Sequence, residues 1–520
     1  MNVLAPETLP DDIAELKQMI VKLHNDNWVL REQVAFFKGK LYGRRSEAWS
    51  AEEIGQMRLF NEAEAGAEAG TGSKVEEQET VKVGAHERGK PGRRKLPAGL
   101  PRVEVVHDLE EKEKVCGCGA ALSRIGEETS EQLDIIPAQV RVLRHIRYKY
   151  ACKKCEGLNG EGPVVKVAPP AVQLIPKSMA SAGLLAYVMS SKFEDALPFY
   201  RQEKLFKRVG VDLSRGTMCG WAIEAAGRCM PLVELLGEEV RAGALVRADE
   251  TVLQVLKEPG RAATTKSYMW VFMGGAVGRP AVLYQYHPSR AGEVAREFLA
   301  GYRGYVQTDG YTGYNELRGE AGIVQVGCWA HVRRKFFEVS TASKNAVSAQ
   351  EAMRYIGRLY GVEHEADRKN VTLEERKALR QREAVPILEE FKGWLDRRVD
   401  QVPPQSLLGK AIHYALGQWE RLVRYVEDGI LTPDNNRAEN AIRPFVIGRK
   451  NWLFSDTPRG AHASAALYSL IETAKANKIE PYWYLRYIFE KLPRLGSDSG
   501  DFKTLLPQYL DKNELYAKPP

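Results

Sequence analysis

The sequence predicts a multidomain protein built around a central α/β fold. Three observations lead to this prediction: the chain is 520 residues long, it begins with a heptad pattern, and its middle changes from helical to strand periodicity. The expected segments, in chain order, are a coiled-coil helix at 1–47, a flexible linker with a basic run at 48–100, a zinc-ribbon-like unit at 101–160, a helix-turn-helix unit at 175–235, the first part of the α/β core at 240–343, an all-helical insertion at 344–430, the second part of the core at 431–480, and a C-terminal helical extension and tail at 481–520.

Composition is ordinary for a soluble protein. Hydrophobic residues make up 44% of the chain, charged residues 28%, and the net charge is +7, so charge alone does not indicate a nucleic-acid partner. The N-terminus lacks the apolar core of a signal peptide, and no stretch reaches the length of a membrane span. We therefore expect a cytoplasmic protein without a membrane partner, whose seven cysteines are reduced and act as ligands or core residues. A basic run at 88–95 reads as solvated linker or as a phosphate contact beside a DNA-binding unit.

The N-terminal helix is expected over residues 12–42, where apolar residues alternate spacings of three and four. A single polar residue, Asn27, occupies a core position, which favours two parallel strands in one register. The pattern therefore predicts a homodimer or a higher assembly through this helix. The alternative is an amphipathic helix packed on its own chain. The core positions are Ile13, Leu16, Ile20, Leu23, Asn27, Leu30, Val34, Phe37 and Leu41.

Two cysteine pairs indicate a structural zinc site. Cys116 and Cys118 lie in one turn, and Cys152 and Cys155 lie in another. Between them, residues 140–150 alternate like a strand, so the two pairs flank a β segment as in a zinc ribbon with four thiolate ligands. The first pair has one intervening residue where two are usual. The alternative is four free thiols.

A helix-turn-helix is expected next. Residues 197–209 form one helix, Gly210 begins the turn, and Ser214 is the N-cap of the following helix. Arg215 and Thr217 would then face a DNA groove. A plain helical hairpin fits the same pattern. Cys219 and Cys229, further along, are expected in the core.

The middle of the chain predicts a mixed sheet. Three antiparallel strands are followed by a helix, a strand, a helix, a strand and a helix, which is the order of a ribonuclease-H-like core. In that architecture the first and fourth strands lie side by side. The strands are expected at 244–256, 266–275, 280–287, 305–309 and 323–327, with a helix at 291–300 and another from Trp329.

Three carboxylates are expected to converge on this sheet. Asp249 lies in the middle of the first strand, Asp309 at the end of the fourth, and Glu439 on a helix at 432–444. An oxygen-only site of this kind suits Mg²⁺ or Mn²⁺, and two such ions support phosphoryl transfer. Because side chains alternate along a strand, only one of Asp249 and Glu250 faces the site, and the sequence leaves that choice open.

The helix that carries Glu439 has its own signals. Thr432 is expected as its N-cap, and Pro444 is expected to end it. Arg443 lies one turn after Glu439, so the alternative to a metal site is a surface ion pair of little energetic value.

Six sequence motifs follow one another along the chain. They are Lys192-Phe-Glu-Asp-Ala-Leu-Pro198, Ala248-Asp-Glu-Thr251, Gln307-Thr-Asp-Gly-Tyr311, Cys328-Trp-Ala-His-Val-Arg-Arg-Lys-Phe336, Asn435-Asn-Arg-Ala-Glu-Asn-Ala-Ile-Arg-Pro444 and Gly448-Arg-Lys-Asn-Trp-Leu-Phe454. In this order they resemble the IS66 family of bacterial insertion-sequence transposases, and the resemblance covers nearly the whole chain. It implies a DDE triad of Asp249, Asp309 and Glu439, with two Mg²⁺ or Mn²⁺ ions, that cleaves DNA at the element ends and joins it to target DNA. It also implies a nucleoid-associated protein and the involvement of accessory proteins of the same element.

Basic residues near these motifs are candidates for phosphate contacts, with ordinary surface charge as the alternative. They are His331, Arg333, Arg334, Arg443, Arg449 and Lys450. Two other functions fit the same residues: a ribonuclease-H-like nuclease or recombinase, which would cut without joining, and an inactive DNA-binding regulator. The intact carboxylates argue against the regulator.

Overall fold

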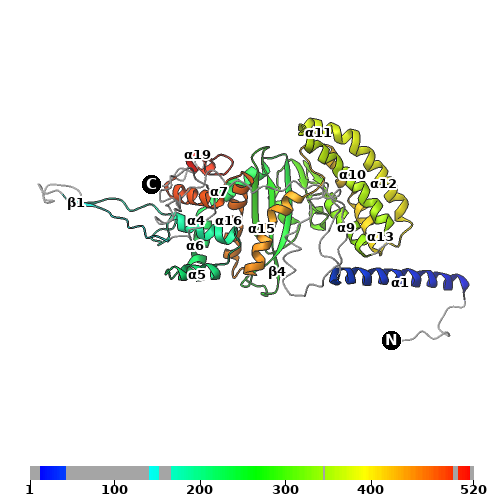
Figure 1. Ribbon diagram of the computed structural model, residues 1–520, viewed down its shortest axis with the longest axis horizontal. Helices are drawn as coiled ribbons and strands as arrows, with labels where there is room; N and C mark the ends of the chain where they lie inside the picture. Colours follow the sequence, from blue (N-terminus) through cyan, green and yellow to red (C-terminus); the bar gives the residue numbers. More distant parts are fainter. Residues whose placement is uncertain (1–11, 43–139, 152–164, 343–345, 496–501, 516–520) are drawn as a thin grey trace, which may run out of the picture. The chain divides into compact units, whose positions relative to one another are not determined.

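The computed structural model describes residues 12–42, 140–151, 165–342, 346–495 and 502–515 (Figure 1). The chain divides into two compact units, residues 1–68 with 147–520 and residues 69–146, and only 140–146 of the second unit are described. The linker at 48–100 and the four cysteines of the expected zinc site lie outside the described residues. Among the described helices, none is both long and apolar enough to cross a membrane.

A five-stranded mixed sheet forms the centre of the larger unit, with strand order β5-β4-β3-β6-β7. The first three strands are antiparallel, whereas β6 runs parallel to β3, and β7 runs parallel to β6. The expected neighbourhood of the first and fourth strands is therefore confirmed. The strands are β3 Leu245–Gln254, β4 Lys266–Gly274, β5 Ala281–His287, β6 Gly304–Gln307 and β7 Ile323–Val326.

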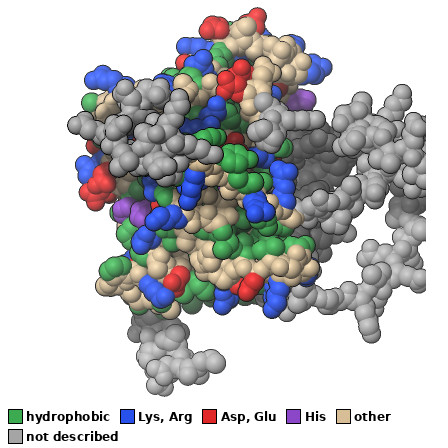
Figure 2. Space-filling view, turned by 90° about the vertical axis from the view of Figure 1, so that its left-hand side faces the viewer, with side chains coloured by type: hydrophobic (Ala, Val, Ile, Leu, Met, Phe, Trp, Pro, Cys, Tyr) green, Lys and Arg blue, Asp and Glu red, His purple; other side chains and the backbone are tan. Residues whose placement is uncertain are grey.

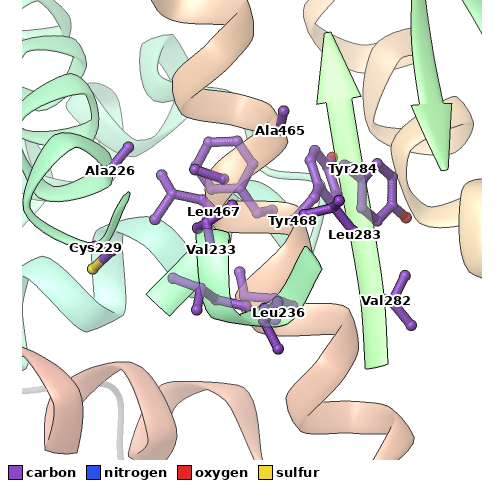
Figure 3. Packing of buried hydrophobic residues seen from close by; sticks show 14 of the residues in the cluster. Ala226, Cys229, Val233, Leu236, Val282, Leu283, Tyr284, Ala465, Leu467 and Tyr468 are labelled. Atoms are coloured by element: carbon purple, nitrogen blue, oxygen red, sulfur yellow. The ribbon is translucent and has the colours of Figure 1, made fainter. Parts of the chain in front are cut away.

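One hydrophobic core lies between the β5 side of this sheet and a layer of helices. Helix α16 packs along β5, and Figure 3 shows Leu467 and Tyr468 of α16 beside Leu283 and Tyr284 of β5. The backbone N–H of Tyr284 donates to the Ser469 hydroxyl at 2.8 Å, so α16 satisfies hydrogen bonds of this edge strand. The helices of this layer are α4 Ala182–Phe193, α5 Phe199–Arg208, α6 Arg215–Arg228, α7 Met230–Arg241, α16 Pro458–Ala476 and α17 Pro481–Lys491.

A second core is made by the helices that follow β7 (Figure 1). Trp329 is fully buried within it, and its indole N–H donates to the Leu422 carbonyl at 3.0 Å. This contact joins the start of α9 to the end of the helical segment. The helices are α9 Trp329–Ala342, α10 Val347–Lys369, α11 Leu373–Leu379, α12 Val385–Val399, α13 Leu407–Gly417 and α14 Trp419–Val423; the short α8 Glu293–Phe298 precedes β6.

Helix α15, Asn436–Trp452, differs from the helix expected at 432–444. Asn435, not Thr432, occupies the N-cap position, and Pro444 lies inside the helix instead of ending it. A proline in a helix interior removes one hydrogen bond and costs about 3 kcal/mol. Burial of Ile442 and Phe445 on either side of it offsets this cost, because both side chains pack into the core beneath.

The N-terminal helix α1, Ile13–Tyr42, is confirmed as helical. One part of it contacts another helix of the chain, whereas its heptad residues are largely exposed. Glu32 accepts a hydrogen bond from the backbone N–H of Leu407 at 3.1 Å, so this part of α1 contacts α13. The heptad residues lie largely exposed: Leu23 and Leu30 are 62% and 60% exposed. The described part of the chain therefore leaves Leu23 and Leu30 of the heptad stripe uncovered.

The strand expected at 140–150 is wrong in extent. Only Lys149–Ala151 forms a strand, β1, which pairs with β2, Val165–Val167. Alternation continues upstream to residue 140, but β2 offers partners only to those three positions.

Candidate active site

The parallel pairing of β3 and β6 brings two aspartates together. The register of the two strands ends at the pair of Arg247 and Gln307, and two residues later Asp249 follows within β3 and Asp309 follows in the loop after β6. Asp249 accepts a hydrogen bond from the backbone N–H of Glu250 at 2.8 Å. Burial and the negative charges of Glu250, Glu439 and Asp309 raise the pKa of Asp249 well above its usual range. The charges of the other two carboxylates expected from the sequence thus both act on Asp249.

Asp249 and Glu250 differ in their partners. The Glu250 carboxylate forms an ion pair with the Arg290 guanidinium at 2.6 Å and accepts a hydrogen bond from the Tyr314 hydroxyl. Its side chain is only 1% exposed. Glu250 is therefore occupied by its own partners, and of the other two carboxylates only Asp309 is among the charges that raise its pKa, whereas both Asp309 and Glu439 raise the pKa of Asp249.

Asp309 is held by the loop that follows β6. Its Oδ1 accepts the backbone N–H of Tyr311 at 2.9 Å, which fixes the turn after the aspartate. Gly310 in between lies against Tyr414 of α13, and a Cβ at this position would stand 2.3 Å from the Tyr414 hydroxyl. The glycine is thus required by the close approach of the helical segment to the aspartate loop.

Glu439 lies in the first turn of α15, and the residue before that helix anchors it to the sheet. The side-chain amide of Asn435 donates to the Ala248 carbonyl at 2.9 Å, directly beside Asp249. The backbone N–H of Asn435 donates to Cys328 Sγ at 3.3 Å, just before α9. These two bonds place the start of α15 against both β3 and α9.

Two basic side chains of α9 face Glu439. His331 Nδ1 lies 3.7 Å from Glu439 Oε1, and Arg334 Nη2 lies 3.8 Å from Oε2. Burial lowers the pKa of His331, and the nearby Arg334 charge adds to this, while Glu439 opposes it. Within the described part of the chain, His331 Nδ1 and Glu439 Oε1 are both buried without a hydrogen-bond partner.

This arrangement fits a divalent cation. A buried aspartate whose pKa is raised by neighbouring carboxylates is stabilised in its ionised form when a cation joins the cluster. The unpartnered Glu439 oxygen offers a further hard donor of the type that Mg²⁺ and Mn²⁺ take.

The sequence did not indicate the roles of Asn435 and Cys328. Their hydrogen bonds join segments about a hundred residues or more apart in the chain, and no local pattern reports such contacts. The one usable signal was the spacing of Cys328 and His331, which are three apart and therefore share a face at the start of a helix.

The helix-turn-helix candidates lie on exposed surface. Ser214 is the N-cap of α6, as expected, and its hydroxyl accepts the Thr217 backbone N–H at 3.1 Å. Arg215 and Thr217 are exposed in the first turn of α6. Figure 2 shows the end of the molecule that carries α5 and α6, where lysine and arginine side chains are interspersed with hydrophobic ones and some acidic ones. Cys229 is buried as expected, whereas the expectation for Cys219 is wrong: it is exposed on α6.

The basic candidates near Glu439 differ in exposure. Arg334 and Lys450 are exposed, and Arg443 is half-buried. Arg449 is also half-buried, and it donates to the Thr251 hydroxyl at 3.2 Å. Arg333 is only 2% exposed, because α9 turns it into the protein, and a phosphate contact there is contradicted.

Comparison with protein families gives four matches along the chain. Residues 177–463 match the model described as transposase IS66 family, which is more than half of the chain. Residues 113–156 match a zinc-finger binding domain of transposase IS66, and residues 469–508 match the IS66 C-terminal element. Residues 29–105 match a model described as transposase C of IS166 homeodomain.

Similar full-length proteins come from Sinorhizobium fredii (strain NBRC 101917 / NGR234). The uncharacterized protein y4jD is 33% identical, with 97% of both chains covered. The uncharacterized protein y4qI is 32% identical, with 97% of this chain and 98% of the relative covered. The uncharacterized protein y4hP is 29% identical, with 89% and 85% covered.

Proposed function

The chain belongs to the IS66 family of transposases, and from this premise we propose that it is a DDE transposase whose catalytic carboxylates are Asp249, Asp309 and Glu439. The observation that supports the proposal is the placement of these groups on β3, on the loop after β6 and on α15. The register of β3 and β6 supports it, and so does the pKa of Asp249, which is raised by burial and Glu250 and further by Glu439 and Asp309.

The reaction consists of two phosphoryl transfers. In the first, water attacks the phosphodiester at an element end, and the bond to the 3′ oxygen breaks to leave a 3′-hydroxyl and a 5′-phosphate. In the second, that hydroxyl attacks a target phosphodiester, forms a new one, and releases a target 3′-hydroxyl. Neither step forms a covalent bond to the protein.

Asp249, Asp309 and Glu439 would hold two Mg²⁺ or Mn²⁺ ions. When bound, such ions activate an attacking oxygen and stabilise a leaving one. The protein's own contribution is positioning. Asn435 fixes the helix of Glu439 against β3, and the Tyr311 backbone N–H fixes the Asp309 carboxylate.

DNA contacts are proposed at two places. Near the carboxylates, the candidates are His331, whose ring can donate a hydrogen bond to a phosphate, and Arg334, Arg443, Arg449 and Lys450, whose charges are suited to phosphates of element-end and target DNA. On the helix-turn-helix, Arg215 and Thr217 are exposed at the start of α6, where a recognition helix contacts base edges.

The remaining segments take supporting roles in the proposal. The strand order supports a ribonuclease-H-like core that is interrupted by the helical insertion between α9 and α15. The zinc-finger match supports a structural zinc ion, for which Cys116, Cys118, Cys152 and Cys155 are the proposed ligands. The exposed heptad stripe of α1 supports a parallel homodimer, in which a second copy covers Leu23, Leu30 and their neighbours.

A joining assay tests this proposal. Purified protein is incubated with Mg²⁺, a labelled duplex carrying the element end, and a target plasmid. The proposal expects cleaved ends and products joined to the plasmid, and it expects both to disappear in Asp309→Ala. Cutting without joining would favour a ribonuclease-H-like nuclease. Unchanged mobility of the element in cells carrying Asp309→Ala would overturn the assignment of the triad.

A further inference from the structure

A second group of potential metal ligands shares Glu439 with the carboxylate site. Ligand atoms of Cys328, His331 and Glu439 all lie within 4.8 Å of one another. Zinc bonds to nitrogen and oxygen of about 2.0–2.2 Å place two such ligands of a tetrahedral ion about 3.3–3.5 Å apart. The 3.7 Å between His331 Nδ1 and Glu439 Oε1 is only slightly longer. The group is thus close to a zinc-binding geometry before any ion enters.

The hydrogen bonds around this group point to a missing partner. Cys328 Sγ accepts hydrogen bonds from the backbone N–H groups of Asn435 and His331. The thiol therefore caps a helix, and this role is enough to explain why it is buried. That role does not explain the other two atoms. Among the described residues, His331 Nδ1 and Glu439 Oε1 are buried side by side without hydrogen-bond partners, although a buried polar atom of this kind costs about 1–3 kcal/mol.

The ligand types differ from those of the carboxylate site. A thiolate, an imidazole and a carboxylate favour Zn²⁺ and similar ions, whereas oxygen-only sites favour Mg²⁺. Arg334 approaches the other Glu439 oxygen, Oε2, so it leaves Oε1 open to an ion. Glu439 is therefore shared by two possible metal sites. With Asp249 and Asp309 it offers only oxygen ligands, and with Cys328 and His331 it offers a softer set of ligands.

We propose that Cys328, His331 and Glu439 bind Zn²⁺, and that this ion withdraws Glu439 from the carboxylate site and inhibits DNA cleavage. The inhibitory part rests on the proposed transposase function, whereas the binding part does not. Binding replaces the thiol proton of Cys328 by the metal and releases that proton to solvent, with no change of oxidation state.

Binding is tested with Co²⁺ on the full-length protein that holds one equivalent of Zn²⁺ per chain, the amount that the proposed four-cysteine site takes. Co²⁺ binds such ligands less tightly than Zn²⁺, so it does not displace zinc from another site. The wild type is expected to gain thiolate-to-cobalt absorption with one added equivalent, and so is the control Cys219→Ser, which removes an exposed thiol. Cys328→Ser and His331→Gln are each expected to weaken this binding at least about 100-fold, beyond the 10- to 100-fold effect of losing an outer partner.

The two variants make the binding test independent of folding failures. Serine at 328 keeps an oxygen that accepts the same backbone N–H groups, and His331→Gln keeps the thiol cap. Cobalt absorption in Cys328→Ser equal to that of the wild type would overturn the site, and so would a wild-type protein that gains no thiolate absorption.

Inhibition is tested by cleavage in Mg²⁺ with increasing Zn²⁺. The cleavage rate of each protein in Mg²⁺ alone serves as its own reference, and Cys328→Ser is expected to need at least about 100-fold more Zn²⁺ than the wild type to reach half of that rate. Equal inhibition of the variant and the wild type would overturn the inhibitory part. If neither protein cleaves DNA at all, the proposed function fails, while the cobalt titration still decides whether the metal binds.

Discussion

Asn435→Ala removes the side chain that ties the Glu439 helix to the sheet. The Asn435 amide is 1% exposed, and its Nδ2 donates to the carbonyl of Ala248, which is equally buried. Alanine leaves that carbonyl without its donor, at a cost of about 1–3 kcal/mol. The Asn435 Oδ1 has no partner among the described residues, so its removal adds no further loss. We therefore expect the unfolding free energy to fall by about 1–3 kcal/mol.

Activity should fall as well, because the lost bond holds the first turn of α15 beside Asp249. Partners that orient a ligand without touching the ion typically change metal affinity or activity by about 10- to 100-fold. We expect a loss of that size in Mg²⁺-dependent cleavage, with part of it recovered at high Mg²⁺. The measurements are urea unfolding followed by fluorescence of the buried Trp270 and Trp329, and single-turnover cleavage of element-end DNA.

Asn440→Ala is the matched control, because Asn440 lies exposed on the same helix. Its unfolding free energy should stay within about 0.5 kcal/mol of the wild type. If Asn435→Ala were as stable as this control and cleaved DNA at the wild-type rate, the bond to Ala248 would not be what positions Glu439.

Two further predictions concern charge and assembly. The pKa of Asp249 is raised by burial and by the carboxylates of Glu250, Glu439 and Asp309, so the metal-free protein loses stability as the pH rises through that raised pKa. Asp249→Asn cannot ionise, so without Mg²⁺ its urea midpoint should rise relative to that of the wild type as the pH increases from the ordinary aspartate pKa of about 4 through the raised pKa; a difference that stays constant with pH would contradict the shift. Asn27 lies exposed on the heptad stripe of α1, and Asn27→Leu should associate more tightly but form mixed oligomers in sedimentation, whereas a monomeric wild type at micromolar concentration would refute the dimer.

Local pattern was enough for the central strands and helices. Alternation predicted β3 and β5 to within two residues, because their buried faces follow from a two-residue period. The same alternation overestimated the strand at 140–150, since strand length also depends on a pairing partner, and β2 pairs only with Lys149–Ala151. The end of the Glu439 helix was misjudged because burial around Pro444 outweighs the proline's local cost.

The carboxylates of the candidate site could be predicted from the sequence. The residues that position them could not. Motif resemblance favoured Asp249 over Glu250, and the physical reason became visible only in the ion pair of Glu250 with Arg290, forty residues away. The capping thiol of Cys328 depends in the same way on a contact with Asn435. Arg333 is buried because of the way α9 packs. The basic residues next to it in the sequence gave no sign of this burial.

The most direct test of the carboxylate metal site exchanges one hard ligand for a soft one. Asp309→Cys keeps a metal-binding group but offers a thiolate, which Mg²⁺ binds poorly and Mn²⁺ accepts better. Cleavage of element-end DNA by this variant is measured in Mg²⁺ and in Mn²⁺, with Asp309→Ala as the control that cannot be rescued. The proposed site predicts no cleavage in Mg²⁺ and its return in Mn²⁺. Cleavage in Mg²⁺ at the wild-type rate would show that Asp309 does not hold the catalytic metal.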